Sequence, residues 1–370
     1  MQTLRQLPKT VWVLGMVSLL TDISSEMIHS VLPLFLVSQL GAAVLTVGLI
    51  EGIAEATASV LKVFSGALSD YLGKRKALTV LGYSLSTFAK PLFFFATSPA
   101  WVLLARFADR VGKGIRVAPR DALVADTTPD SMRGAAYGLR QSLDTIGAFL
   151  GPLAAFGLLA IAPENFRLVF ALALIPGFLA VSLLVVGIQE PQATTSRPKT
   201  NPLRWEALGL LGSKYWFLLA IALLFNLGNS SDAFLLLRAE QSGIAAAFVP
   251  LTLVMMNIAY SLSAYPAGLL SDRLGRLGLL VSGFVVYAIV YLGFALVQQS
   301  WQVWGLFALY GLYLGLSQGI LLALVADTVP IELRGTAFGF LNLVIGIALL
   351  PASLLAGYLW ESFGPSSTFI

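Results

Sequence analysis

Charged side chains recur at helical spacing inside apolar stretches of this 370-residue chain. Asp22, Glu26 and His29 stand at i, i+4 and i+7, so on a helix they would lie on one face within an arc of roughly 60°. Two further stripes of this kind are Glu51, Glu55 and Lys62, and Arg140 with Asp144. Such faces can pair opposite charges, exchange protons or hold a metal ion through oxygen and nitrogen ligands. Because lysine and arginine accompany these acids, we expect no metal.

The densest set of charges lies between residues 100 and 125 and comprises Arg106, Asp109, Arg110, Lys113, Arg116, Arg120 and Asp121. At roughly 100° per residue, all of them fall within an arc of about 140° on a helix. Leu104 and Phe107 are among the residues outside that arc. Such a helix would have one ionic face and one apolar face.

The composition is that of a membrane protein. Hydrophobic residues make up 57% of the chain, charged residues 11%, and the mean hydropathy is +0.84. Soluble domains carry about a quarter charged residues, so we expect a lipid bilayer around most of this surface. The net charge of +4 gives no reason to expect nucleic acid as a partner. With no cysteine, phosphate loop, metal cluster or pair of nucleophile and base, the sequence predicts neither an enzyme nor a bound cofactor.

Two polar segments occur twice, about two hundred positions apart. Gly66, Leu68, Ser69, Asp70, Leu72, Gly73 and Arg75 recur as Gly268, Leu270, Ser271, Asp272, Leu274, Gly275 and Arg276. The pattern Asp-x-x-Pro-x-x-x-Arg-Gly begins at Asp126 and again at Asp327, with its arginines at 133 and 334. A fixed offset between polar loops in an apolar chain indicates a tandem duplication of two membrane-embedded halves.

The apolar runs predict eleven membrane-spanning helices, since a span needs about 20 residues. Their approximate bounds are 11–39, 46–69, 77–96, 100–125, 136–161, 166–188, 215–237, 246–270, 277–297, 302–326 and 336–360. The charged run 100–125 is included because its repeat partner, 302–326, carries no charge. The prediction is an all-α polytopic protein with bundles at 1–188 and 214–370, a linker at 189–213, and a twelfth helix absent from the chain.

The distribution of lysine and arginine predicts the orientation. With the N-terminus in the cytoplasm, the inner ends of the predicted spans hold thirteen of the 23 basic residues. The outer ends hold only Lys90, Arg167 and Arg238. We therefore expect an integral protein of a bacterial-type inner membrane.

The repeated loops, together with the plan of six plus six helices, resemble the major facilitator superfamily. The resemblance covers the whole chain and implies two bundles that rock about a central cavity, lined by the first, fourth, seventh and tenth helices. It also implies a cytoplasmic gate formed by Asp70, Arg75, Asp126, Arg133, Asp272, Arg276, Asp327 and Arg334. It implies a single-chain transporter of a small molecule, which we expect to be a monomer.

The charged stripes predict an ion-pair network inside the first bundle, since an unpaired charge at mid-bilayer costs about 2.5–3.5 kcal/mol. We expect Glu26 or Glu55 against Arg110 or Lys113 at mid-membrane. Asp144 is expected against Arg116 or Arg120. Such a network can be purely structural. Lys90, by contrast, is expected at an outer helix end.

Some of these groups are candidates for proton coupling. Burial disfavours a charged carboxylate and a neighbouring cation favours it, so a conformational change can load and release a proton on Glu26 or Glu55. His29, the only histidine, has an ordinary pKa near 6.5, which suits proton exchange. The full set predicted to bind substrate or protons is Asp22, Glu26, His29, Glu51, Glu55, Arg110, Lys113, Arg116, Arg120, Asp144, Asn229 and Asp232.

The second half is poorer in charge, with Asn229 and Asp232 where the first half has Asp22 to Glu26. This asymmetry predicts a solute whose anionic end binds the first half. Its apolar remainder is expected against Met255, Met256, Tyr260, Phe307, Tyr310 and Tyr313.

The predicted function is proton-coupled export of a small organic solute with anionic character, driven by the proton gradient. The run Gly147-x-x-x-Gly151-Pro152 resembles a motif of antiporters in the superfamily, although Ala155 and Phe156 replace its following glycine pair. One alternative is an importer of an anionic metabolite or a carboxylate siderophore, driven by proton symport or by the solute gradient alone. A further alternative is a membrane sensor that binds a ligand without transporting it.

Overall fold

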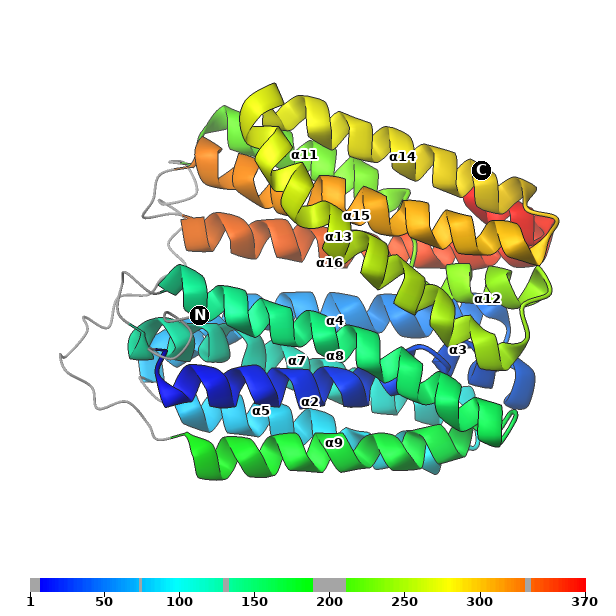
Figure 1. Ribbon diagram of the computed structural model, residues 1–370, viewed down its shortest axis with the longest axis horizontal. Helices are drawn as coiled ribbons and strands as arrows, with labels where there is room; N and C mark the ends of the chain where they lie inside the picture. Colours follow the sequence, from blue (N-terminus) through cyan, green and yellow to red (C-terminus); the bar gives the residue numbers. More distant parts are fainter. Residues whose placement is uncertain (1–6, 73–74, 129–132, 189–210, 330–333) are drawn as a thin grey trace.

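The computed structural model describes residues 7–72, 75–128, 133–188, 211–329 and 334–370, which are helical with no strand among them (Figure 1). The helices of the first half are α2 (Lys9–His29), α3 (Leu32–Leu34), the π-helix η1 (Phe35–Gln39), α4 (Val44–Leu72), α5 (Arg75–Ala89), α6 (Pro91–Phe94), α7 (Pro99–Thr127), α8 (Arg133–Ile161) and α9 (Phe166–Gly187). Those of the second half are α11 (Gly212–Leu227), α12 (Ala233–Gln241), the 3₁₀-helix η3 (Ala246–Phe248), α13 (Val249–Leu274), α14 (Arg276–Leu296), α15 (Ser300–Thr328), α16 (Arg334–Phe363) and the 3₁₀-helix η5 (Pro365–Phe369).

Each predicted span coincides with one of these helices or with a consecutive set of them. Within the described ranges, eight helices or helix sets have the length and apolar character to cross a membrane. The described chain ends with η5 and has no twelfth span. The prediction of an all-α polytopic membrane protein is therefore confirmed.

Three predicted spans are broken rather than continuous. The first divides into α2, α3 and η1, and Pro33 lies at the start of α3. The third breaks at Lys90, where Pro91 begins α6, because proline has no amide hydrogen to continue the backbone ladder. The seventh is non-helical over residues 228–232, between α11 and α12. A broken helix at membrane depth is stable only where the freed backbone groups are buried in protein or line a cavity.

The helices run side by side along the long axis of the molecule, with α2 to α9 in the lower part of Figure 1 and α11 to α16 in the upper part. The main contacts between these two sets are those of α4 with α16 and of α8 with α13. The predicted bundle boundary falls largely on residues outside the described ranges, so the domain division remains a prediction.

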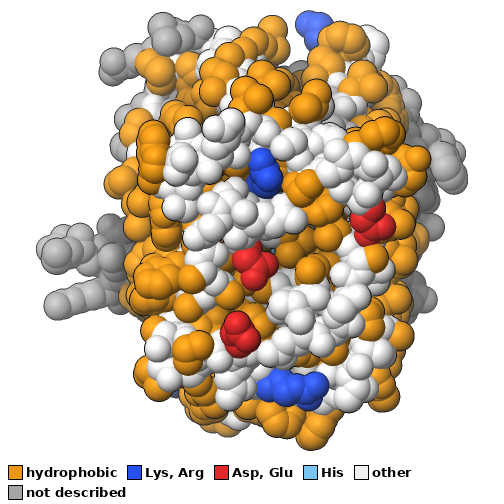
Figure 2. All heavy atoms as spheres, turned by 90° about the vertical axis from the view of Figure 1, so that its right-hand side faces the viewer, with side chains coloured by type: hydrophobic (Ala, Val, Ile, Leu, Met, Phe, Trp, Pro, Cys, Tyr) orange, Lys and Arg blue, Asp and Glu red, His pale blue; other side chains and the backbone are white. Residues whose placement is uncertain are grey.

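Contacts between the two sets of helices include several at the end remote from the N-terminus. There the Leu45 amide donates to the Glu361 carboxylate at 2.8 Å, and the rings of Phe156 and Phe248 lie 5.4 Å apart. Figure 2 views this end, where charged side chains are isolated among hydrophobic and uncharged ones. Nearer the N-terminal end, by contrast, a cavity of about 720 Å³ separates α8 from α13 between Gln141 and Ala264.

Within the first half, α8 packs closely on α2 through glycine. A Cβ atom added at Gly151 would lie 2.6 Å from the Cβ of Glu26 and 2.9 Å from the carbonyl oxygen of Ile23. One added at Gly147 would lie 2.8 Å from the Cβ of Asp22. These two glycines therefore permit the close approach of α8 to α2, and the same contact fixes the register of the acidic stripe on α2.

We predict that Gly151→Ala lowers the free energy of unfolding by about 1–3 kcal/mol, because the added methyl group would force α2 and α8 apart. The melting temperature of the purified protein in detergent measures this effect. Gly157→Ala is the matched control on the same helix, since a Cβ atom at Gly157 has no neighbour within 4 Å. Equal melting temperatures for the two variants would contradict the close contact.

Candidate functional site

The ionic face of α7 points into the protein. Arg106 and Arg110 are only 3% and 7% exposed, whereas Leu104 and Phe107 on the opposite face are 50% and 43% exposed. The amphipathic helix predicted from the spacing is therefore present, and its apolar side forms part of the outer surface. Ion pairs inside the first half account for most of the buried charge.

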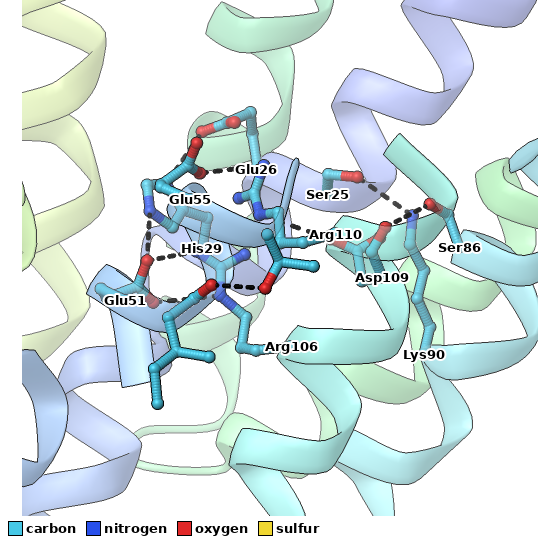
Figure 3. A network of polar contacts seen from close by, with 12 residues as sticks. Ser25, Glu26, His29, Glu51, Glu55, Ser86, Lys90, Arg106, Asp109 and Arg110 are labelled. Carbon is cyan, nitrogen blue, oxygen red and sulfur yellow. Dashed lines mark hydrogen bonds and ion pairs between the residues drawn. The ribbon is translucent and has the colours of Figure 1, made fainter. Parts of the chain in front are cut away.

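A deeply buried ion pair joins α7 to α4 and is shown in Figure 3. Arg106 donates to both carboxylate oxygens of Glu51, with Nε 3.0 Å from Oε1 and Nη2 bonded to Oε2. His29 of α2 lies beside this pair, with Nε2 3.8 Å from the same Oε2 of Glu51. Its Nδ1 lies 3.5 Å from a carboxylate oxygen of Glu26. One imidazole thus bridges acids from two helices.

A second pair lies one helical turn further along the same two helices. The Arg110 guanidinium is 3.1 Å from a carboxylate oxygen of Glu55. This contact confirms the predicted pairing of a mid-membrane acid with Arg110. Asp109, the neighbour of Arg110, is 6% exposed and lies 3.8 Å from its Nε atom.

The position of Lys90 differs from the prediction, which placed this residue at an outer helix end. Its side chain is 1% exposed, and the ammonium donates to Ser24 at 2.5 Å and to Ser25 at 3.3 Å (Figure 3). The break between α5 and α6 places Lys90 inside the bundle, where it faces α2. A positional count of basic residues could not detect this, because the break was not predicted.

Asp144 also differs from expectation. It pairs with Arg140 of its own helix at 2.5 Å rather than with Arg116 or Arg120. Arg116 instead donates to Ser86 and stacks 4.6 Å from the ring centre of Tyr83, while Arg120 pairs with Asp121 at 3.0 Å. The i, i+4 spacing allows the short contact of Arg140 with Asp144 without any approach of α7.

The predicted gate is described only in part. Arg75 of α5 donates from Nε to Asp126 of α7 at 2.5 Å and from Nη1 to Ser69 of α4 at 3.1 Å. Arg276 begins α14. The side chains that lie outside the described residues are those of Asp70, Arg133, Asp272, Asp327 and Arg334.

A cavity of about 500 Å³ lies between the two halves. Five residues of the predicted site line it, namely His29, Glu51, Glu55, Asn229 and Asp232. The other predicted site residues, which do not line it, are Asp22, Glu26, Arg110, Lys113, Arg116, Arg120 and Asp144. The cavity thus contacts the paired carboxylates of α4, while the arginines of α7 lie behind them.

The second half supplies an aromatic and polar wall. Residues 228–232 break the seventh span, and this break brings Asn229 and Asp232 to the cavity. The Tyr310 hydroxyl donates to Asp232 at 2.8 Å, and Tyr287 donates to the Gly228 carbonyl oxygen at 2.8 Å. These tyrosines of α15 and α14 hold the non-helical segment in place.

Of the side chains expected to contact the apolar part of the solute, Tyr310 and Tyr313 line this cavity. Met255 is 37% exposed, whereas Met256 and Phe307 are buried in the core. Tyr260 lines the cavity between α8 and α13 instead. Sequence reasoning missed Phe225 and Phe284, which line the central cavity. Phe225 lies on α11 just before the break in the seventh span, Phe284 lies on α14, and that break was not visible in the apolar pattern.

The geometry is that of a polytopic helical protein with a central cavity whose wall carries paired and titratable side chains, which is the class of membrane transporters. The sequence profile of the Major Facilitator Superfamily matches residues 14–238 and 233–370. The chain belongs to this superfamily.

Similar proteins include an uncharacterized MFS-type transporter of Methanocaldococcus jannaschii, which is 35% identical and aligns over 99% of this chain and 92% of its own length. A gentisate transporter of Corynebacterium glutamicum is 28% identical over 83% of this chain and 71% of its own length. Among solved structures, a bacterial homolog of the human lysosomal transporter Spinster, inward-facing and unoccupied, has a TM-score of 0.79 at 18% identity. The aligned region covers 96% of this chain and 82% of the chain of that structure.

Proposed function

We propose that this transporter couples proton movement to the export of a small organic solute by alternating access. The supporting observation is that His29, Glu55 and Asp232 line one cavity between the two halves. A rocking motion that changes the distance between Glu55 and Arg110 would change the proton affinity of the Glu55 carboxylate. Protons could then be taken up on one side of the membrane and released on the other.

Each group of predicted residues has a role in this proposed mechanism. His29, Glu51, Glu55, Asn229 and Asp232 contact the solute or carry the proton. Arg110, Lys113, Arg116 and Arg120, with Asp22, Glu26 and Asp144, set the charge balance behind the cavity wall. The proposed cytoplasmic gate includes the bonds of Arg75 to Asp126 and Ser69. The N-terminus is proposed to face the cytoplasm of a bacterial-type inner membrane, with the protein acting as a monomer.

The expected anionic character of the solute loses its main support. That expectation placed the cations of α7 at the cavity, but the described residues that line it include three acids and one histidine and neither lysine nor arginine. The similarity to a gentisate transporter favours a second candidate function, which is uptake of an aromatic carboxylate. Transport assays with solutes of either charge separate the two.

The test uses purified protein in liposomes that contain a trapped pH-sensitive dye and an acidic lumen. Phenyltrimethylammonium, benzenesulfonate or gentisate is added outside. Exchange is expected to make the lumen more alkaline than in protein-free liposomes. Solute counterflow with no change in luminal pH would contradict proton coupling, and binding without counterflow would favour a sensor. Acidification of a neutral lumen on addition of gentisate would favour proton-coupled uptake.

A further inference from the structure

We propose that the central cavity binds an organic ammonium ion, with its positive charge at Asp232 and its apolar part against the aromatic side chains of the second half. This inference rests on the proposed function and specifies the class of solute. It reverses the charge expected from the sequence.

The carboxylates of the cavity differ in their partners. Glu51 pairs with Arg106, and Glu55 pairs with Arg110. Asp232 takes part in no ion pair among the described residues, where its side chain accepts a hydrogen bond to Oδ1 from the neutral hydroxyl of Tyr310. A carboxylate inside a membrane protein is stable when a cation accompanies it. A cation from solution is therefore expected to bind most favourably next to Asp232.

Aromatic side chains lie on the same wall as Asp232. Phe225 and Phe284 are stacked, with ring centroids 4.0 Å apart and an angle of 18° between their planes. Tyr313 lies 5.9 Å from Phe225 and 5.4 Å from Tyr310, measured between ring centroids. All of these residues line the cavity. Aromatic faces attract ammonium ions, and quaternary ammonium groups in particular, through the ring quadrupole.

The break in the seventh span fixes Asp232 with respect to this aromatic wall. The amide of Ser231 donates to the Ser353 hydroxyl of α16 at 3.2 Å, and the hydroxyl of Ser231 accepts from the amide of Ala233 at 3.3 Å. With Tyr310 on Asp232, these bonds hold the carboxylate in one place before any solute binds. A preorganised acid loses little conformational freedom on binding. The cavity, at about 500 Å³, is within the size range of sites for small organic molecules.

The direct test measures binding of phenyltrimethylammonium to purified protein in lipid nanodiscs by isothermal titration calorimetry at constant pH. Benzenesulfonate has a similar size and the opposite charge. We expect the cation to bind and the anion not to bind. Asp232→Asn, which keeps an oxygen for Tyr310, is expected to weaken cation binding at least tenfold, and Asp232→Glu to restore part of it. Phe225→Leu is expected to weaken binding severalfold through loss of the ring face.

Glu240→Gln is the matched control, because Glu240 lies near the other end of α12 and does not line the cavity. It should bind the cation as wild type does. The melting temperature of each variant confirms that it is folded. Unchanged cation affinity in a folded Asp232→Asn protein would overturn the inference, as would tighter binding of benzenesulfonate than of phenyltrimethylammonium.

The liposome assay separates this inference from the proposed function. Proton exchange evoked by benzenesulfonate but not by phenyltrimethylammonium would overturn the ammonium site and leave proton-coupled transport intact. A different result is that phenyltrimethylammonium binds in a manner that depends on Asp232 and shows counterflow, but evokes no proton exchange. This result would support the ammonium site and contradict proton coupling.

Discussion

Replacing Arg106 with methionine is expected to destabilise the protein more than any other single change considered above. Glu51 is 1% exposed, and its two oxygens accept both hydrogen bonds from Arg106. Without the guanidinium, the buried carboxylate would lose both of these hydrogen bonds, and the imidazole of His29, 3.8 Å away, would not replace them. Removal of one partner of a buried ion pair costs about 3–5 kcal/mol. The measurement is thermal unfolding in detergent, followed by tryptophan fluorescence.

The double variant Arg106→Met with Glu51→Gln provides the internal comparison. Because the buried charge is removed together with its partner, we expect the double variant to recover most of the lost stability. Lys214→Met is a control for loss of a basic side chain, since Lys214 is exposed at the start of α11. A double variant as unstable as Arg106→Met alone would show that the ion pair is not the cause.

Glu55→Gln is expected to abolish solute-driven proton exchange while the protein remains folded. Glu55 lines the cavity and is 28% exposed at its side chain, so glutamine can occupy its place without a buried void. The amide cannot exchange a proton with solution, and it no longer neutralises Arg110. A reduction of at least tenfold in the rate of luminal alkalinisation is the expected result in the liposome assay.

Glu164→Gln is the matched control, because Glu164 is exposed in the turn between α8 and α9. It should show the wild-type rate. If Glu55→Gln retains both the rate and its dependence on the pH gradient, then Glu55 does not carry the coupled proton. His29, Glu51 and Asp232 would then be the remaining acidic and imidazole groups of the described cavity wall.

The duplication allowed α7 to be predicted as a span despite its charges. Hydropathy alone excludes this helix, and it is absent from the helices that meet the length and apolarity required of a span. Its repeat partner, α15, has no charge over residues 302–326, meets those requirements and therefore identified it. Helical periodicity then separated the face of Arg106 and Arg110, which are buried, from the face of Leu104 and Phe107, which are exposed.

The partners of these charges were harder to predict. Spacing places residues on a face, but it does not give the rotation and height of the neighbouring helix. For this reason Glu51 with Arg106 was missed, and Asp144 was assigned to the wrong helix. The breaks at Lys90 and at residues 228–232 were hidden within continuous apolar runs. Their consequences, the buried ammonium of Lys90 and the position of Asp232 at the cavity, depend on contacts between segments distant in sequence.

The most direct test of the account is a spin-label scan along α7, because the chain contains no cysteine and each position can be labelled singly. In lipid bilayers, collisions with oxygen report exposure to acyl chains. The account predicts that oxygen accessibility varies with a helical period, with maxima at Leu104 and Phe107 and minima at Arg106 and Arg110. Maxima at the two arginine positions would place the ionic face in lipid and contradict both the ion-pair network and the cavity behind it.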